Sequence, residues 1–358
     1  MKKILISTGG TGGHVMPALA LYDHYKKNFN TFITTDKRGL SFINRENYPC
    51  HIINTPNILK NKLMLPINLV LLIFKLFTSI FFLKKYKIDY VVSTGGYMSL
   101  PICLAAKILN LKIILFEPNM VLGKSNKLFL KYASKIICYS DNLMNFPENL
   151  KDKIYIINPL LRKKIYSKNQ KNIKKNNKIL KILIIGGSQG AKFFDKKISD
   201  LIIEINKKIK IFVIHQIVNK QNQSEIKTNY DKNYIDNFLF EFDDKIFDKF
   251  HDIDLAISRS GASTIFELAE LKIPFIAVPL PNSKDNHQYY NAKYFSDKNC
   301  CWLINQSEFE NIEIKNFINN LLTNREEILL KKQNMTKFSY QNTWNNVNQK
   351  LISLINEN

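Results

Sequence analysis

The sequence predicts an α/β protein made of two doubly wound domains that face each other across a cleft. The first observation behind this prediction is that two segments of the chain, one in each half, have similar sequences. Residues 3–14 and 181–191 each run from a short β-branched stretch into a glycine-rich turn. A doubly wound unit begins with such a strand, loop and helix. The second observation is the length of 358 residues, which is long for one hydrophobic core and sufficient for two.

Short apolar runs follow each glycine turn at intervals that leave room for helices, and we expect them to be strands of parallel sheets. They lie at residues 32–35, 90–93, 113–116, 136–139 and 154–157 in the first half, and at 211–215, 238–240, 255–258 and 275–278 in the second. Residues 162–181 hold eight lysines, a composition that suits an exposed connection. We therefore predict one domain over residues 1–160 and a second over 161–340, with a helix at about 341–358 packing back on the first.

The composition narrows the class of partner. The net charge is +22, yet only five of the 52 basic residues are arginine, on which nucleic-acid binders depend for bidentate recognition. We therefore expect no nucleic acid as partner, but attraction to anionic lipids and phosphorylated substrates. Five cysteines without CxxC spacing indicate neither a zinc site nor a disulfide framework, so we expect a reducing compartment. The N-terminal apolar run is short and enters a glycine loop, and we interpret it as a strand rather than a signal peptide.

Three polar loops follow successive strands of the first half, and their positions predict one face of a ligand site. The Thr8–His14 loop offers backbone amides, Thr11 and an imidazole, and the other two loops lie at Ser93–Pro101 and Phe116–Asn119. The histidine either only hydrogen-bonds its loop or acts chemically, and its place after four glycines favours a chemical role. The first loop does not match GxGxxG in register, but Asp36 after the next strand leaves NAD binding open.

In the second half, residues 258–269 combine glycine and small residues with a helix whose first turns carry Thr264 and Glu267. Free amides at a helix N-terminus can bind a diphosphate, and a carboxylate one turn further can accept both hydroxyls of a ribose. An ordinary capped amphipathic helix is the alternative. The 279–288 loop suits sugar hydroxyls, or it is a solvated turn. We interpret the Asp252–Asp254 motif, which leads into an apolar strand, as surface rather than as a metal site.

Taken together, these segments resemble the MurG family in order and spacing from about residue 3 to 345. The motifs that carry the resemblance are Gly9–His14, Thr94–Tyr97, Glu117–Asn119, Asn158-Pro159 with Arg162, Gly186–Ala191, Arg259–Ala262 with Glu267, and Asp285–Gln288 with Asn291-Ala292. The resemblance implies a GT-B fold and an inverting transfer of N-acetylglucosamine from UDP-GlcNAc to the MurNAc 4-hydroxyl of undecaprenyl-pyrophosphoryl-MurNAc-peptide (lipid I), which gives lipid II. It also implies a peripheral enzyme of peptidoglycan synthesis at the cytoplasmic face of the inner membrane, with no metal or cofactor and with other cell-wall enzymes as candidate partners.

The resemblance also assigns residues. Donor contacts of the family fall on Thr11, Gly12, Gly13, Asn119, Arg162, Ser188, Phe242, Ala262, Ser263, Thr264, Ile265, Phe266, Glu267 and Gln288, and the acceptor side falls on Thr94, Gly95, Gly96 and Tyr97. His14 is the candidate general base because an unperturbed imidazole titrates near neutral pH, and Glu117 is the alternative base. The family's usual His-Glu-Gln-Asn reads Phe116–Asn119 here, where Pro118 removes a backbone donor. An extra residue between Phe242 and Arg259 leaves open which side chain lines the uracil.

Residues Pro66–Lys87 are the candidate membrane contact. Their uninterrupted apolar span, Ile67–Leu83, is 17 residues long with Lys75 near the middle. A helix that crosses a membrane requires about 20 apolar residues. We expect a helix with one face in the protein and another at the lipid interface, anchored by Lys84, Lys85 and Lys87. A buried core helix and a membrane span are the alternatives.

Three other functions remain open at this point. The first is a related UDP-sugar transferase that glycosylates another membrane lipid, such as diacylglycerol. The second is a sugar-nucleotide binding protein without catalysis, and the third is an NAD-dependent dehydrogenase. Release of UDP that requires lipid I would exclude the second, and NAD binding would support the third.

Overall fold

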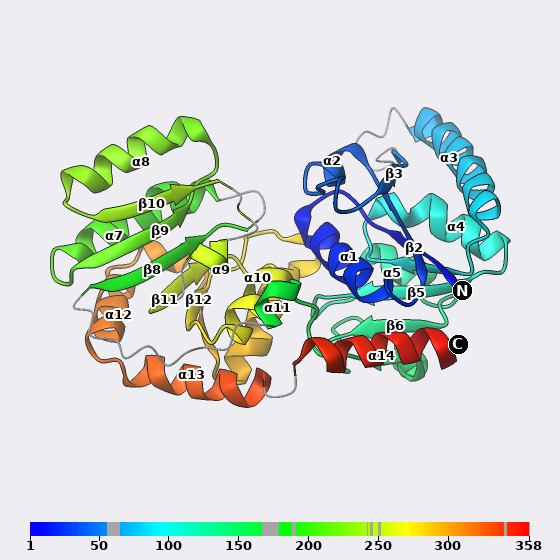
Figure 1. The fold of residues 1–358 in the computed structure, drawn as a ribbon. Coiled ribbons are helices and arrows are strands. Elements are labelled where there is room, and N and C mark those ends of the chain that lie inside the picture. Colours follow the sequence, from blue (N-terminus) through cyan, green and yellow to red (C-terminus); the bar gives the residue numbers. More distant parts are fainter. Residues whose placement is uncertain are drawn as a thin grey trace. The chain divides into compact units, whose positions relative to one another are not determined.

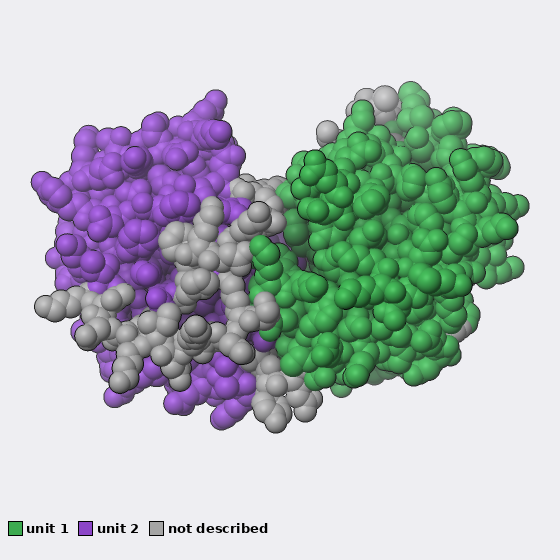
Figure 2. Space-filling view, viewed as in Figure 1, with its two compact units in different colours: residues 1–166, 342–358 green, residues 167–341 purple. Residues whose placement is uncertain are grey.

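Two parallel β-sheets organise the chain, one in each of two compact units (Figure 1). The computed structural model describes residues 1–55, 65–166, 179–187, 191–241, 243, 246–249, 252–339 and 342–357. Unit 1 comprises residues 1–166 and 342–358, and unit 2 comprises residues 167–341 (Figure 2). Residues 161–166 thus belong to unit 1, although the sequence analysis assigned them to the second domain.

Unit 1 contains a seven-stranded parallel sheet in the order β3-β2-β1-β4-β5-β6-β7. Its strands are β1 (Lys3–Ser7), β2 (Asn30–Thr35), β3 (Cys50–Ile52), β4 (Tyr90–Ser93), β5 (Lys112–Glu117), β6 (Lys135–Cys138) and β7 (Ile154–Ile156). Its helices are α1 (Gly12–Tyr25), α2 (Lys37–Leu40), α3 (Leu65–Tyr86), α4 (Leu100–Ile108), α5 (Lys124–Phe129), α6 (Lys163–Tyr166) and α14 (Trp344–Glu357). Every paired strand is parallel, so the chain crosses over between neighbours as a doubly wound fold requires.

Unit 2 repeats this plan with six strands in the order β10-β9-β8-β11-β12-β13. They are β8 (Leu180–Ile185), β9 (Ile211–Gln216), β10 (Asp236–Phe240), β11 (Leu255–Ser258), β12 (Phe275–Ala277) and β13 (Cys301–Leu303). The helices are α7 (Ser199–Asn206), α8 (Lys220–Lys232), α9 (Ile246–Lys249), α10 (Ala262–Glu270), α11 (His287–Asp297), α12 (Ile312–Thr323) and α13 (Glu326–Ser339), and a π-helix covers Phe194–Ile198. The predicted fold class, two doubly wound α/β domains, is confirmed.

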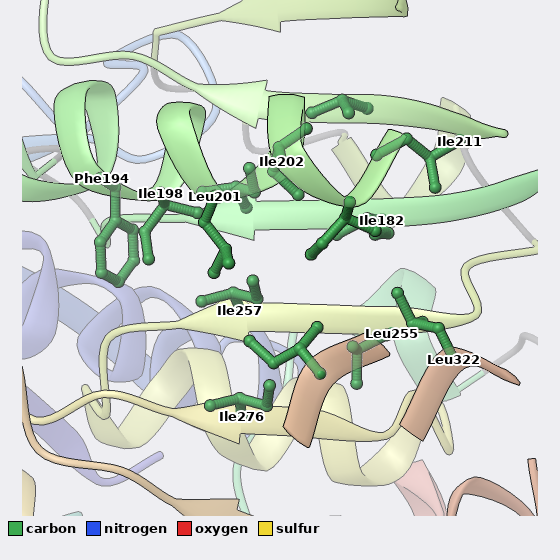
Figure 3. Packing of buried hydrophobic residues seen from close by; sticks show 14 of the residues in the cluster. Ile182, Phe194, Ile198, Leu201, Ile202, Ile211, Leu255, Ile257, Ile276 and Leu322 are labelled. Atoms are coloured by element: carbon green, nitrogen blue, oxygen red, sulfur yellow. The ribbon is translucent and has the colours of Figure 1, made fainter. Parts of the chain in front are cut away.

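In both sheets the hydrophobic core is built around the central strands. These strands are covered on both faces, and they therefore read as nearly continuous apolar runs. In unit 2, Ile182, Ile257 and Ile276 come from three neighbouring strands and pack with Phe194 and Ile202 from the covering helical segments (Figure 3). All five side chains are buried. This packing holds the strand ends in register, and the strand ends in turn position the loops.

The C-terminal helix α14 belongs to unit 1. The ring of Trp344 stacks on the imidazole of His24 with 3.7 Å between centroids, and Tyr155 donates to the carbonyl of Lys350 at 2.9 Å. Burial lowers the pKa of His24 to about 4, so the stacked imidazole is neutral at physiological pH.

The strand order reverses at one point in each sheet. In unit 1 this point lies between β1 and β4, and in unit 2 it lies between β8 and β11. Open α/β sheets bind ligands at such switch points, outside the carboxyl ends of the strands. The loops after these four strands are the glycine-rich and serine-rich segments that the sequence analysis selected.

Candidate active site

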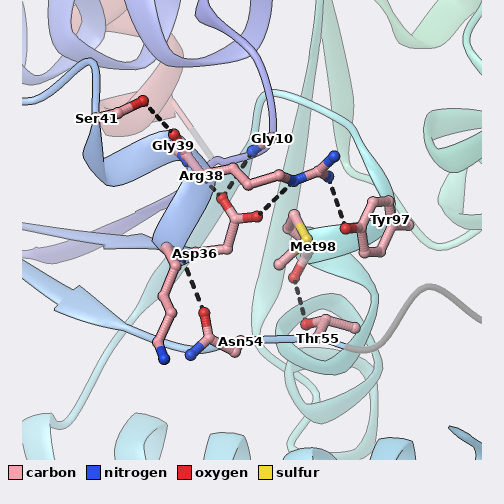
Figure 4. Close-up of polar contacts among 10 residues, drawn as sticks. Gly10, Asp36, Arg38, Gly39, Ser41, Asn54, Thr55, Tyr97 and Met98 are labelled. Carbon is pink, nitrogen blue, oxygen red and sulfur yellow. Dashed lines mark hydrogen bonds and ion pairs between the residues drawn. The ribbon is translucent and has the colours of Figure 1, made fainter.

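The glycine loop after β1 is held by a carboxylate at the end of β2. The Oδ1 atom of Asp36 accepts hydrogen bonds from the amides of Gly10 and Gly39, each at 2.8 Å (Figure 4). A Cβ atom at Gly9 would lie 2.7 Å from the same oxygen, so only glycine fits there. Asp36 is buried, and its carboxylate is engaged by its own backbone neighbours. This explains Asp36 without an NAD ribose.

The side chain of Arg38 extends from this cluster toward the loop after β4. Its Nε lies 3.5 Å from Asp36 Oδ2, and its Nη2 donates to the hydroxyl of Tyr97 at 2.6 Å (Figure 4). The predicted acceptor-side residues Thr94–Tyr97 therefore lie beside the glycine loop of β1. Thr94 is tied to β1 directly, because its amide donates to the carbonyl of Ser7 at 3.1 Å.

His14 lies in the first turn of α1, with its ring against the second glycine loop. Its Nδ1 is 2.8 Å from the carbonyl oxygen of Thr94. A carbonyl oxygen only accepts, so Nδ1 carries the proton and the lone pair of the neutral ring resides on Nε2. Gly95 and Gly96 have φ values of 88° and 80°, and a Cβ atom at either position would approach the imidazole to within 3.4–3.5 Å. The positive φ values are the reason for glycine at both positions, and a Cβ atom there would only touch the half-buried imidazole at van der Waals distance.

Glu117, the alternative base, is 3% exposed and fully engaged by its surroundings. Oε1 accepts from the amide and the side chain of Asn119 at 3.2 and 3.0 Å, and Oε2 accepts from the Gly123 amide at 2.8 Å and Asn126 Nδ2 at 3.0 Å. Burial raises the pKa of this carboxyl group, whereas the four donors oppose that shift. Such a carboxylate organises the loop after β5, and its geometry offers little room for a substrate hydroxyl.

The remaining predicted residues of unit 1 lie at the same edge of its sheet or directly before α6 (Lys163–Tyr166). Thr11 is the N-cap of α1, and its side chain makes no capping hydrogen bond; Gly12 and Gly13 follow it in the first turn. Asn119 is half-buried in the loop after β5. Arg162 is half-buried and directly precedes α6.

In unit 2, Arg259 follows β11 and carries a buried charge. It is 5% exposed, donates from Nη1 to the carbonyls of Val278 and Pro279 at 3.3 and 3.1 Å, and donates from Nη2 to Gln306 Oε1 at 2.6 Å. All these acceptors are neutral, and no ion pair joins Arg259 to a carboxylate of the described residues. Burial lowers its pKa to about 10, so the guanidinium remains charged at neutral pH. A buried cation therefore lies directly after β11.

The helix α10 begins at Ala262, three residues after this arginine, and its N-cap Gly261 provides no side-chain capping bond. Ser263 and Thr264 are half-buried in its first turn, whereas Glu267 is 7% exposed. Ile265 and Phe266 are buried, the latter against Phe295 with 4.8 Å between ring centroids. Their side chains are part of the core, so any ligand contact at these two positions would come from the backbone.

Gln288, the predicted sugar contact, holds two loops together. Its Oε1 accepts from the amides of Leu280 and Ser260 at 2.9 and 3.3 Å, and Asn291 Nδ2 donates to the carbonyl of Ser260 at 3.1 Å. Ser188 and Phe242, two further predicted donor contacts, lie outside the described residues.

The acidic motif before β11 lies at the opposite end of the sheet. Asp254 accepts from the amide of Lys181 at 2.9 Å and lies 3.8 Å from Arg325. It therefore links the starts of β11 and β8. At 9% exposure Asp254 is buried, so its interpretation as a surface residue is wrong. In the part of the chain that the structure describes, no three His, Cys, Asp or Glu side chains gather as a metal site would require.

Sequence reasoning missed several residues that shape this site. Asn126 is a buried asparagine within a helix, and a single asparagine in a helical pattern gives no signal. Asn291, also buried in a helix, belonged to a recognised motif but was given no role. Arg259 stood inside a recognised motif but was given no role, although an arginine directly after a buried strand is unusual enough to have been singled out.

Comparisons with known proteins agree with this geometry. Residues 4–138 match the glycosyltransferase family 28 N-terminal domain, and residues 181–348 match the glycosyltransferase family 28 C-terminal domain. A protein of Pelagibacter ubique is 49% identical over 357 residues, covering 100% of this chain and 99% of its own, and one of Rickettsia felis is 35% identical, covering 94% and 95%. Both are named UDP-N-acetylglucosamine–N-acetylmuramyl-(pentapeptide) pyrophosphoryl-undecaprenol N-acetylglucosamine transferase.

Solved structures show the same fold. The crystal structure of Acinetobacter baumannii MurG superposes with a TM-score of 0.77 at 23% identity and covers all of both chains. UDP-GlcNAc 2-epimerase from Neisseria meningitidis, bound to UDP-GlcNAc, superposes with a TM-score of 0.65 at 14% identity. The GT-B prediction is therefore confirmed.

Proposed function

This chain belongs to the MurG family within glycosyltransferase family 28, and from that premise we propose how its residues perform the transfer. The enzyme moves N-acetylglucosamine from UDP-GlcNAc to the muramyl sugar of lipid I, which gives lipid II. The names of its relatives specify the muramyl acceptor, and they lend no support to diacylglycerol transfer, a silent binding protein or a dehydrogenase. In this proposal unit 1 serves the acceptor and supplies the donor contacts predicted at Thr11–Gly13, Asn119 and Arg162, and unit 2 supplies the other donor contacts.

The general base in this proposal is His14, and the observation that carries it is the hydrogen bond from Nδ1 to Thr94. That bond leaves the lone pair on Nε2, where it can take the proton of the acceptor 4-hydroxyl. The hydroxyl oxygen then attacks the anomeric carbon, and the bond from that carbon to the β-phosphate oxygen breaks. UDP leaves from the opposite face with the bonding electrons, so the configuration inverts. Glu117 is the weaker candidate because four donors already occupy its oxygens.

The donor diphosphate is assigned to the N-terminus of α10. Its first-turn amides lack a side-chain cap, and the unpaired charge of Arg259 lies three residues before Ala262. Negative charge that develops on the leaving diphosphate is stabilised by such pre-oriented dipoles and by a fixed cation. Glu267 is assigned to the ribose hydroxyls, and the backbone at Ile265 to the base.

UDP release by the purified enzyme tests this assignment. With UDP-GlcNAc and a lipid I analogue, His14→Ala should lower turnover by about 10²-fold or more, and the variant should lose the acidic limb of the wild-type pH–rate profile, which a general base produces because its protonated form cannot accept a proton. Binding of UDP should stay unchanged, and the free energy of unfolding should fall only by about 1 kcal/mol, because one hydrogen bond to Thr94 is lost. A variant with normal turnover would remove His14 from the role of base. Release without any acceptor would instead indicate simple hydrolysis.

We also propose that α3 places the enzyme on the membrane surface. By length and composition alone this helix could span a bilayer, since it has 22 residues and a mean hydropathy of 2.1; core helices and signal sequences also satisfy that criterion. In this structure only 6% of its apolar window is buried, so it is not a core helix. Its C-terminal half packs on the unit 1 core through Leu76, Ile80 and Leu83. A helix docked on one side and apolar on the other suits the plane of the lipid interface.

The exposed face of α3 supports this proposal. It consists of large apolar side chains that are 43–68% exposed, namely Ile67, Leu69, Val70, Leu71, Ile73, Phe74, Phe77 and Phe81. A contiguous apolar surface on a soluble unit marks an interaction site. The cytoplasmic face of the membrane is the assigned location because lipid I and UDP-GlcNAc must meet there.

Sedimentation with vesicles tests the membrane contact. The double variant Phe77→Ser/Phe81→Ser should lose most of its vesicle binding, because two phenyl rings leave the interface. The matched control Leu329→Ser/Leu330→Ser changes two exposed apolar side chains on α13 of unit 2, which are 56% and 45% exposed, and should bind as the wild type does. Equal binding by all three proteins would remove α3 as the contact.

A further inference from the structure

Arg259 is a buried cation whose hydrogen-bond acceptors are all neutral. Its Nη1 atom donates to two backbone carbonyls, those of Val278 and Pro279, and its Nη2 atom donates to Oε1 of Gln306 at 2.6 Å. Its Nε atom is buried and has no acceptor among the described residues. Proteins generally pair a buried charge with an opposite charge, because an uncompensated charge is costly to desolvate. This arginine is therefore an exception that requires a physical reason.

Among these acceptors, only the one at position 306 has a charge that depends on the side chain. Backbone carbonyls are neutral in any sequence, whereas a glutamate at position 306 would place a carboxylate oxygen where Oε1 of the glutamine lies. Nε2 of Gln306 makes no hydrogen bond with the described residues, so an oxygen in its place would break none there. The carboxylate of Glu308, in the same 3-10 helix (Gln306–Glu310), accepts from the amide and the side chain of Asn305 at 2.8 Å each. The turn after β13 therefore provides Arg259 with an acceptor but not with a counter-charge.

The surroundings of Arg259 hold its guanidinium in place without neutralising it. The ring of Phe194 lies beside the guanidinium, with 4.8 Å from the guanidinium carbon to the ring centroid. The backbone amide of Arg259 donates to the carbonyl of Ile185 at 3.0 Å, which fixes the residue at the switch point between β8 and β11. Helix α10, to which the donor diphosphate is assigned, begins three residues later. A fixed cation in surroundings of low dielectric constant attracts a nearby anion more strongly than it would in water.

We propose that Gln306 is a specificity-determining residue for the donor. It positions the guanidinium of Arg259 and, because it is neutral, leaves that charge uncompensated for the diphosphate of the nucleotide. The inference rests on the donor site proposed above. The bound nucleotide then supplies the negative charge for which the described residues provide no carboxylate. The site thereby distinguishes a nucleoside diphosphate from the uncharged nucleoside, and the residue at position 306 determines how strongly it does so.

The isosteric substitution Gln306→Glu in the full-length protein tests this role, because it adds a carboxylate and leaves the shape of the side chain unchanged. The variant should melt at least as high as the wild type, since a guanidinium donates more strongly to a charged acceptor than to a neutral one. Its affinity for UDP, measured by calorimetric titration, should fall by about tenfold. At a separation of about 10 Å and an effective dielectric constant of about 20, one unit charge changes the binding of an anion by roughly this factor. The affinity for uridine, which carries no charge, should stay within about twofold of the wild-type value, because the added charge has no diphosphate to repel.

Two further variants separate the charge of position 306 from its contribution to stability. Gln306→Met removes the acceptor without adding a charge, so it should lower the melting temperature but weaken UDP binding less than Gln306→Glu does. The matched control Gln333→Glu makes the same chemical change at an exposed position of α13, where solvent screens the new charge, and it should bind UDP as the wild type does. If Gln306 served stability alone, Gln306→Met would be the weaker binder of UDP, and that ranking would overturn the proposal.

Arg259→Met distinguishes a failure of this inference from a failure of the donor site. Weakened UDP binding in Arg259→Met together with wild-type UDP affinity in Gln306→Glu would overturn the role of Gln306 alone. Unchanged UDP affinity in both variants would overturn the assignment of the diphosphate to α10, and this inference with it. Equal losses of UDP and uridine affinity in Gln306→Glu would also contradict the proposal, because the effect would then not depend on the diphosphate.

Discussion

Replacing Glu117 by glutamine separates its two conceivable roles, base and organiser of a loop. The carboxylate accepts two hydrogen bonds on each oxygen, from the backbone amides of Asn119 and Gly123 and from the side-chain NH2 groups of Asn119 and Asn126. In the amide, one of these oxygens becomes an NH2 group that faces two donors. Two bonds to a charged acceptor are lost, at roughly 1.5–3 kcal/mol each, and part of this loss is offset because the buried charge disappears. We expect unit 1 to lose about 3–5 kcal/mol of stability.

Urea unfolding can measure this loss in unit 1 alone. The chain has two tryptophans, Trp302 in unit 2 and Trp344 in unit 1, so a Trp302→Phe background leaves one indole that reports unit 1. In that background, Glu117→Gln should shift the Trp344 transition to lower urea and raise the KM for UDP-GlcNAc, because Asn119 is no longer held. A variant with an unchanged transition and with turnover reduced as far as in His14→Ala would refute this reasoning and make Glu117 the base.

Three further predictions follow from particular contacts. The pKa of His24 is lowered to about 4, so between pH 6.5 and 4 only the unfolded chain binds a proton at this residue. As the pH falls through that window, unit 1 should therefore lose up to about 3 kcal/mol of its free energy of unfolding, measured as the urea midpoint of the Trp344 transition. His24→Gln should make this midpoint less dependent on pH. Gly96→Ala places a Cβ atom against the His14 ring at a φ of 80°, and this strain should lower the free energy of unfolding by about 1–2 kcal/mol. Steady-state rates and calorimetry should show that kcat falls more than the affinity for UDP. Arg259→Met removes the unpaired cation and should weaken UDP by about tenfold or more while changing uridine little, whereas equal losses for both ligands would indicate a structural role only.

The contact between His14 and Thr94 shows which parts of the site can be predicted from sequence and which cannot. The glycine loop and His14 were selected because a strand, a tight turn and a helix leave a local pattern of residue types. The bond from His14 to Thr94 joins residues 80 positions apart, and it exists because β1 and β4 are neighbours in the sheet. Such a partner is decided by topology and is invisible in a local pattern.

The same limit explains the missed strands. The central strands are buried on both faces, and their apolar runs predicted them directly. The edge strands β3 and β13 have three residues each. In β3 the run is interrupted by His51, and β13 is apolar but too short to be told from a loop by its pattern alone. Their pairing depends on a neighbouring strand that is already in place.

By itself the sequence determined the two doubly wound domains, the motifs at the strand ends and the family, because these depend on local composition and on order along the chain. The tertiary structure alone decided the state of each functional group. Burial and distant partners set the tautomer of His14, saturated the carboxylates of Asp36 and Glu117, and left Arg259 charged without an acidic partner among the described residues. These are properties of surroundings, and surroundings come from segments far apart in the chain.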